Sequence, residues 1–218
     1  YPRLNVKIVG SHGGLSVGED GATHQCIEDY ALMRAIPNMA VLSPCDANEM
    51  RCAVRALVNY DGPAYLRLGR LAMDCVTDAI PGYRFQWGKG ILLREGADAT
   101  VIATGMMVQM ALQAADTLAA EGISVRLIDM HTIKPLDYEL VLQAALETRC
   151  IVTTEEHSVI GGLGSAVAEL LAERHPVPAA FVGVRDRFGK SGEFEELLAY
   201  FGLDAAAVVE AVKRVLAV

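Results

Sequence analysis

Two histidines and two carboxylates share one short glycine-rich stretch near the start of the sequence. His12, Glu19, Asp20 and His24 lie within Ser11–Gln25, which reads SHGGLSVGEDGATHQ. An imidazole titrates near neutral pH, so it can donate a hydrogen bond or carry a proton. Glycines allow such a loop to fold tightly. These residue types suit a ligand-binding site, although solvated loop residues with one helix cap would produce the same pattern.

An alternation of strands and helices must position this loop. Strands are expected at residues 4–9, 40–42, 65–68, 91–94, 100–104, 124–129, 150–154 and 179–184. Helices are expected at 23–36, from Asp46 onward, and at 107–121, 138–147, 164–174, 194–201 and 205–216. Such alternation implies parallel strands with helices on both sheet faces. The loop at 11–25 would then follow a strand at its carboxyl end, where α/β proteins bind ligands.

The fold class predicted from this pattern is α/β, with two consecutive three-layer domains, mainly parallel sheets and an incomplete first domain. Residues 71–88 lack sustained periodicity and contain Pro81 and Gly82. We therefore expect a first domain at 1–72, a linker at 73–88 and a second domain at 89–218. The helix after Asp46 should bury Val54, Leu57 and Val58.

Composition excludes several classes of protein. The net charge of −8 argues against a nucleic-acid-binding protein. The longest uncharged run, Ala99–Ala115, contains glutamines and a glycine, which favours a strand and helix over a membrane span. The five cysteines form no C-x-x-C pair, so their spacing supports neither a zinc site nor a disulfide framework. We expect buried, reduced thiols in a cytoplasmic protein. Because the sequence starts with Tyr1, we also expect a piece of a longer protein.

The stretch at 11–25 resembles the transketolase motif H-x-x-x-x-x-G-E-D-G-x-T-H-Q, with both histidines and the aspartate in register. The resemblance extends over essentially all 218 residues. In the first half it includes R-A-I-P-N-M at 34–39, P-x-D at 44–46 and Arg70. In the second half it includes G-K-G at 88–90, I-D-M at 128–130, I-K-P-L at 133–136 and E-E-H-S-V-I-G-G-L-G at 155–164.

The resemblance to the transketolase family implies a role for each matching residue. His12 and Arg70 would hold the phosphate of a sugar substrate, and an arginine suits this because it donates two parallel hydrogen bonds. Asp20 would accept a hydrogen bond from a substrate hydroxyl. His24 would be the catalytic residue beside the reacting oxygen. Glu19 would be the structural member of the acidic pair.

The resemblance also implies what lies outside this sequence. The full enzyme would use thiamine diphosphate with Mg²⁺ or Ca²⁺. The Gly-Asp-Gly…Asn motif that holds the diphosphate and its metal is absent, and the activating glutamate would precede Tyr1. Ala22, Cys26 and Gly13-Gly14 depart from the common pattern and resemble transketolases encoded as two chains. An N-terminal transketolase section is therefore an expected partner, in a homodimer or heterotetramer, and this chain alone should be inactive and bind no cofactor.

The reaction implied is transfer of a two-carbon ketol unit from a ketose phosphate to an aldose phosphate. Three alternatives stay open. The related 1-deoxyxylulose-5-phosphate synthase shares D-G-x-T-H, but Glu19 and Gln25 favour a transketolase. The string E-D-G-x-T-H-Q disfavours the β-subunit of a 2-oxo-acid dehydrogenase. A non-catalytic interaction fragment is the third alternative.

A few other residues could also do chemistry. Gly161–Gly164 is either a phosphate cradle or a tight turn into a helix, and the turn is favoured because the full G-x-G-x-x-G spacing is lacking. His157 is expected at a surface or interface. His131 and His175 are expected to be structural or solvated. Arg67 would either assist phosphate binding or form a salt bridge.

Overall fold

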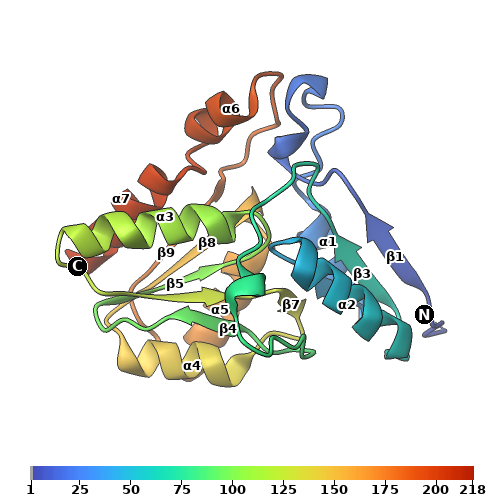
Figure 1. Ribbon diagram of the computed structural model, residues 1–218, viewed down its shortest axis with the longest axis horizontal. Coiled ribbons are helices and arrows are strands. Elements are labelled where there is room, and N and C mark those ends of the chain that lie inside the picture. The colour runs from blue at the N-terminus through green and yellow to red at the C-terminus, as the bar shows by residue number, and fades with distance from the viewer. Residues whose placement is uncertain (1) are drawn as a thin grey trace.

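Two separate β-sheets organise the protein in the computed structural model, which describes residues 2–218 (Figure 1). The first sheet has the strand order β1–β3–β2–β7. Strands β1, β3 and β2 are parallel, whereas β7 pairs antiparallel with β2. Their bounds are Lys7–Gly10 for β1, Ala40–Leu42 for β2, Ala64–Arg67 for β3 and Thr132–Lys134 for β7.

The second sheet has the order β4–β6–β5–β8–β9 and is parallel except for β4, which runs antiparallel to β6. Helices α3 and α7 cover one face and helices α4 and α5 the other (Figure 1). The strand bounds are Ile91–Arg94, Ala99–Ala103, Val125–Asp129, Ile151–Ser158 and Ala179–Val184 for β4, β5, β6, β8 and β9. The helix bounds are Met107–Ala120, Tyr138–Glu147, Leu163–Arg174, Phe194–Phe201 and Ala205–Leu216 for α3 to α7.

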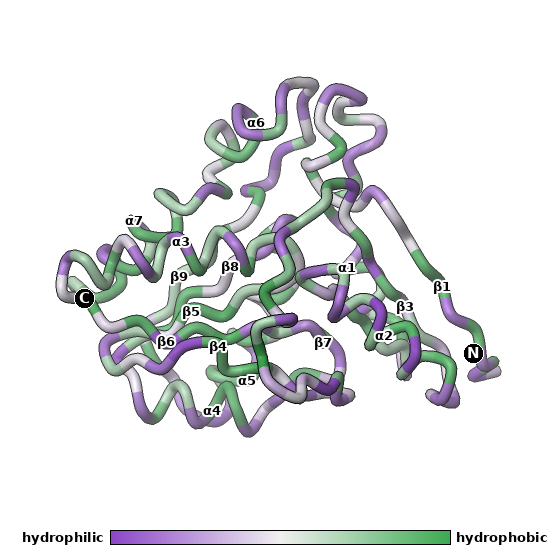
Figure 2. Tube along the Cα trace, in the orientation of Figure 1, coloured by the Kyte–Doolittle hydropathy of each residue, from purple (hydrophilic) through white to green (hydrophobic). Residues whose placement is uncertain are grey.

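The helices form layers on the second sheet because each of them has one apolar face that packs against it. Apolar and polar residues alternate along α3 and α4, as the green and purple segments of Figure 2 show. The buried apolar residues of α3 and α7 form one cluster with β5, and those of α4 and α5 form a second. No helix within residues 2–218 is long and apolar enough to span a membrane.

The first sheet is covered by α2 (Ala47–Asn59) and α1 (Asp29–Ala35). The α/β class with two mainly parallel sheets is therefore confirmed. Two expectations about this half were wrong. The helix expected at 23–36 begins only at Asp29. The residues before it belong to the loop, because Cys26 forms an isolated β-bridge with Gly13. Strand β7 was not expected at all, although it ties residues 132–134 to the first sheet.

The register of α2 also differs from the expected one. Val54 and Val58 are exposed, whereas Glu49, Ala53 and Leu57 are buried. The Asp46 carboxylate caps the helix by accepting a hydrogen bond from the Glu49 N–H at 2.8 Å. Positions 49, 53 and 57 are four residues apart and share a face, so the buried face begins with an acidic residue and does not include the two valines.

All five cysteines are free thiols, but the expectation that they are buried holds for only two. Cys45 and Cys150 are buried, Cys52 is half-buried, and Cys26 and Cys75 are exposed. Two 3₁₀ helices complete the structure: η1 (Leu15–Asp20) lies in the glycine-rich loop, and η2 (Thr77–Ala79) lies between the two sheets in sequence.

Candidate functional site

The expected site residues follow two neighbouring parallel strands. His12 lies two residues after β1 and Arg70 three residues after β3. Gly10 pairs with Arg67 at the carboxyl ends of these strands, so both loops leave the same edge of the sheet. Asp20 ends η1 and His24 lies in the turn that follows, where its backbone N–H donates to the Gly21 carbonyl at 3.0 Å.

One direct contact joins members of this set. The Arg70 guanidinium lies 3.8 Å from the Asp20 carboxylate, with 42% and 52% of the two side chains exposed. Arg70 also donates to the Val17 carbonyl at 2.5 Å, which holds it against η1. The cation is therefore positioned by the loop while part of it remains accessible to an anionic ligand.

The two histidines are exposed and are oriented by their sequence neighbours. The Nδ1 atom of His12 lies 3.1 Å from the Ser11 hydroxyl, and that of His24 lies 3.0 Å from the Thr23 hydroxyl. Neither Nε2 atom has a hydrogen-bond partner among residues 2–218. The structure thus places all four expected residues on loops at one sheet edge, joins Asp20 to Arg70, and leaves both imidazoles free to meet a ligand.

A buried network lies beneath this loop and settles the role of Arg67. Its Nε lies 3.2 Å from the Asp29 carboxylate, and it donates to the Tyr30 hydroxyl at 2.7 Å and the Glu156 carbonyl at 2.9 Å. Burial raises the pKa of Tyr30 to about 12, so its hydroxyl stays protonated. Arg67 therefore forms the salt bridge rather than a phosphate contact.

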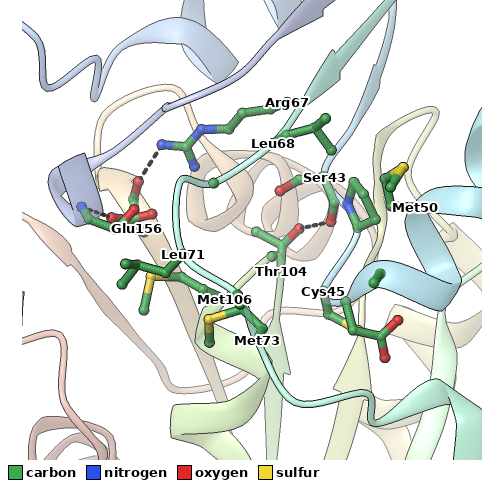
Figure 3. A pocket seen from close by; sticks show the side chains of 17 residues that line it. Ser43, Cys45, Met50, Arg67, Leu68, Leu71, Met73, Thr104, Met106 and Glu156 are labelled. Atoms are coloured by element: carbon green, nitrogen blue, oxygen red, sulfur yellow. Dashed lines mark hydrogen bonds between the residues drawn. The ribbon is translucent and has the colours of Figure 1, made fainter.

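Glu156 ties the glycine-rich loop to the second sheet. The Ser16 backbone N–H donates to a Glu156 carboxylate oxygen at 2.5 Å (Figure 3). Burial raises the pKa of Glu156, while the nearby Arg67 charge opposes that rise. A side chain at Gly14, where φ is 92°, would collide with this carboxylate, so the close approach requires glycine.

A second tie reaches the loop from the far end of the second sheet. The buried Gln25 amide lies within hydrogen-bond distance of the carbonyls of Leu15 (3.3 Å), Gly18 (3.2 Å) and Lys190 (3.0 Å). Lys190 belongs to the segment between β9 and α6, which lies beside η1 in Figure 1. A side chain at Gly189 would strike the Gln25 amide oxygen. Gln25 therefore joins the two halves of the protein directly at the site.

The Gly161–Gly164 segment is a turn and not a phosphate cradle. The Glu155 carboxylate accepts hydrogen bonds from the backbone N–H groups of Leu163 at 2.7 Å and Gly164 at 2.8 Å. A protein carboxylate thus already takes the position at the start of α5 that an anion would need.

His157 is fully buried, which corrects the expectation of a surface position. Its Nε2 accepts a hydrogen bond from the Tyr30 N–H at 3.1 Å, and its Nδ1 lies 2.7 Å from the Ser158 carbonyl. The proton therefore sits on Nδ1. His157 packs between the two halves and has a structural role. His131 is also buried, and its ring packs on Phe85 with centroids 4.3 Å apart.

A cavity of about 260 Å³ lies where the carboxyl ends of strands from both sheets meet (Figure 3). Ser43 follows β2, Thr104 follows β5, and Arg67 and Glu156 belong to β3 and β8. Sulfur and hydrocarbon side chains, among them Met50, Leu71, Met73 and Met106, form much of its wall. The cavity adjoins the glycine-rich loop through Ser16.

Sequence reasoning predicted the exposed residues of the candidate site but missed the buried ones that hold their loop in place. Gln25 and Glu156 were part of recognised motifs, yet nothing in their spacing indicates partners 165 and 140 positions away in the chain. One signal in the sequence could have pointed to them. A glutamine or a pair of glutamates next to apolar residues needs hydrogen-bond partners if it is buried.

Comparison with known proteins agrees with the fold and the loop motif. Residues 1–74 match the transketolase pyrimidine-binding domain, and residues 88–208 match the transketolase C-terminal domain. The fold is therefore an α/β protein with two transketolase-type domains, and the two matches together cover most of the chain. This chain belongs to the transketolase family.

Individual relatives give the same result. A putative transketolase C-terminal section from Methanocaldococcus jannaschii is 44% identical over 96% of this chain and 66% of its own length. A 1-deoxy-D-xylulose-5-phosphate synthase from Geobacter sulfurreducens is 41% identical over 98% of this chain and 34% of its own. A solved split-gene transketolase, described as an inactive β4 tetramer, superposes with a TM-score of 0.92 at 48% identity, over 100% of this chain and 69% of that one. The chain thus spans about 66% of the first curated relative.

Proposed function

We propose that this protein is the C-terminal section of a two-chain transketolase, which transfers a two-carbon ketol unit from a ketose phosphate to an aldose phosphate. The observation that carries this proposal is the loop contact between Asp20 and Arg70, on the segment that also holds both exposed histidines. The sheet edge carries one cation, one carboxylate and two imidazoles. The cation suits a phosphate group, the carboxylate suits a hydroxyl group, and the imidazoles can hydrogen-bond to oxygen atoms of either kind.

Each side chain has a role that its chemistry supports. Arg70 binds the substrate phosphate, aided by His12, because a guanidinium keeps its charge at any working pH and matches phosphate oxygens with paired donors. Asp20 accepts a hydrogen bond from a sugar hydroxyl. His24 donates to the reacting oxygen, or holds its proton, through the free Nε2 atom.

Thiamine diphosphate, when bound in the assembled enzyme, supplies the carbanion stabilisation that two-carbon transfer requires. We propose that another chain provides its diphosphate and metal site. Among residues 2–218, the one group of three metal-type donors includes a thiol, whereas Mg²⁺ and Ca²⁺ take oxygen ligands. We therefore assign the diphosphate and its metal to the companion N-terminal section, and sugar positioning to this chain.

The outer strand of the first sheet supports assembly with further protein. Val6, Ile8 and Val9, in and next to β1, are 49%, 41% and 56% exposed. A run of exposed apolar side chains on an unpaired strand edge is typical of a surface that other protein covers. We propose that a transketolase N-terminal section and a second copy of the assembly, as a dimer or heterotetramer, bury surfaces of this kind.

Reconstitution tests the proposed function. The protein should show no ketol transfer alone and should gain it when mixed with a matching N-terminal section, thiamine diphosphate and Mg²⁺. Replacing the ketose phosphate by pyruvate tests the synthase alternative, which stays relevant because of the 41% identical relative. An assembled complex that is inactive with every donor would favour the non-catalytic interaction fragment.

A further inference from the structure

A compact group of metal-type donors lies where the two halves of the protein meet, and none of its members is a proposed sugar-site residue. Cys45, Glu49 and Asp129 each present one donor atom, and these atoms lie within 4.8 Å of one another. They come from the loop after β2, from α2 and from the end of β6. All three residues are buried, with exposed fractions of 2%, 0% and 0%.

Asp129 is the unusual member of this group. Neither of its carboxylate oxygens lies within ordinary hydrogen-bond distance of another polar group in the described part of the chain, although the residue is completely buried and the Cys45 thiol and Glu49 carboxyl adjoin it. The charged neighbours that act on it, Glu49 and Asp46, are acidic, and no Lys or Arg among residues 2–218 forms a salt bridge with any of the three donors. A buried carboxylate without a partner is costly, so the group favours either a shared proton or a bound cation.

From this arrangement we infer that Cys45, Glu49 and Asp129 bind a divalent ion of the zinc type. A thiolate with two carboxylates suits Zn²⁺, which accepts sulfur and oxygen together, and does not suit Mg²⁺ or Ca²⁺. Ligands of a tetrahedral ion with bonds of about 2.0–2.3 Å lie roughly 3.3–3.8 Å apart, so the donors need to approach by at most about 1.5 Å.

The surroundings of the group match those of a metal site. The Tyr83 hydroxyl and the Cys45 backbone N–H each donate to Glu49 at 2.7 Å, which fixes the orientation of this ligand. Cys45 also lines the 260 Å³ cavity, which offers an entry route. The spacing of cysteines in the sequence did not reveal the site, because only one of its ligands is a cysteine.

Binding of the divalent ion is coupled to the release of protons from its ligands. The ion replaces the thiol proton of Cys45 and any proton that the two carboxyls share, and these protons pass to solvent. The bound ion would link the first sheet to the second, because Cys45 and Glu49 belong to one and Asp129 to the other. Its role is therefore structural. The inference does not depend on the proposed sugar site.

Metal titration of the chelator-treated protein tests the site. The protein should take up one equivalent of Zn²⁺ per chain, and one equivalent of Co²⁺ should produce a thiolate-to-cobalt charge-transfer band in the near ultraviolet. Asp129→Asn should weaken binding at least tenfold, and Cys45→Ser should abolish the band. Cys75→Ser, at an exposed cysteine outside the group, is the matched control and should leave both unchanged.

Three results would overturn the inference, and two of them need no variant. The first is a wild-type protein without stoichiometric Zn²⁺ uptake. The second is wild-type protein with bound Co²⁺ but no charge-transfer band. The third is a band that survives Cys45→Ser. A shared proton in place of an ion predicts that Zn²⁺ leaves the melting temperature unchanged, whereas a bound ion raises it by mass action.

Discussion

At the residue scale, two arginines three positions apart differ in burial, and this difference assigns one of them a structural role and leaves the other accessible. Arg67 lies in β3 and is 4% exposed. Its guanidinium forms an ion pair with Asp29 and donates hydrogen bonds to the Tyr30 hydroxyl and a backbone carbonyl. Arg70 lies beyond the strand end and keeps 42% of its side chain exposed. Only the second is accessible to an anionic ligand such as the proposed substrate phosphate.

This contrast predicts different effects of the same substitution. Arg67→Met leaves the Asp29 carboxylate buried without its partner, so the free energy of unfolding should fall by about 3–5 kcal/mol. Arg70→Met removes an exposed ion pair and should change it by less than about 1 kcal/mol. Urea unfolding of both variants measures the difference. Equal effects would mean that the Arg67 network does not hold the loop.

His157 predicts a pH dependence of stability. Burial lowers its pKa below the ordinary value of 6.5, so the folded protein binds fewer protons than the unfolded chain below that pH. The free energy of unfolding should therefore fall as pH decreases from 6.5, with a slope contribution of up to about 1.4 kcal/mol per pH unit.

Comparison of His157→Gln with wild type between pH 7.5 and about 5 isolates this contribution. The variant lacks the titrating group and should lose part of the slope, whereas His175→Gln, at a half-exposed residue, should keep it. Parallel pH profiles for wild type and His157→Gln would contradict the assignment of a neutral, buried imidazole.

At the scale of elements, the glycine-rich loop is held by contacts from the second half of the chain. Gln25 reaches the Lys190 carbonyl, and Glu156 accepts from the Ser16 N–H. The loop conformation therefore depends on the segment between β9 and α6 and on β8, although neither carries an expected site residue.

Loss of the Gln25 contact should loosen the loop. Gln25→Ala leaves buried carbonyls without donors and should cost about 1–3 kcal/mol. Gly189→Ala should have a similar effect, because its added methyl group would strike the Gln25 amide. Hydrogen exchange should rise at residues 15–25 in both variants. Gly69→Ala is the control, since the nearest atom to its added carbon is 4.0 Å away.

Regular elements could be predicted from sequence where periodicity and burial agree. Six spans match the structure to the residue: 40–42, 91–94, 138–147, 179–184, 194–201 and 205–216. The pattern misled where an element is held by distant partners. Strand β7 has three residues and exists because β2 offers it an edge, and the start of α1 is delayed because Cys26 bridges to Gly13.

For the candidate site, the sequence motif supplied the exposed residues, and only the fold shows what positions them. His12, Asp20, His24 and Arg70 follow from the motif alone. The network of Arg67, the hydrogen bonds of Gln25 and the cluster at Asp129 join segments far apart in the chain, so no local pattern could reveal them.

At the scale of the whole molecule, strands of both sheets end at the same cavity, which adjoins the glycine-rich loop. The contacts of Gln25, Glu156 and His157 all cross between the halves, so the second half supports the site without contributing an expected substrate ligand. Under the proposed function, this arrangement would let the chain position a sugar while a companion chain holds the cofactor.

The most direct test of this account compares phosphorylated and unphosphorylated acceptor sugars in the enzyme assembled with its companion section. Arg70→Met should lower kcat/KM for the phosphorylated sugar about 10- to 100-fold, the loss expected for a charged hydrogen bond of about 1.5–3 kcal/mol. Activity with the unphosphorylated sugar should stay within about threefold of wild type. An equal loss with both sugars, or no loss with either, would contradict the assignment of a phosphosugar site at this loop.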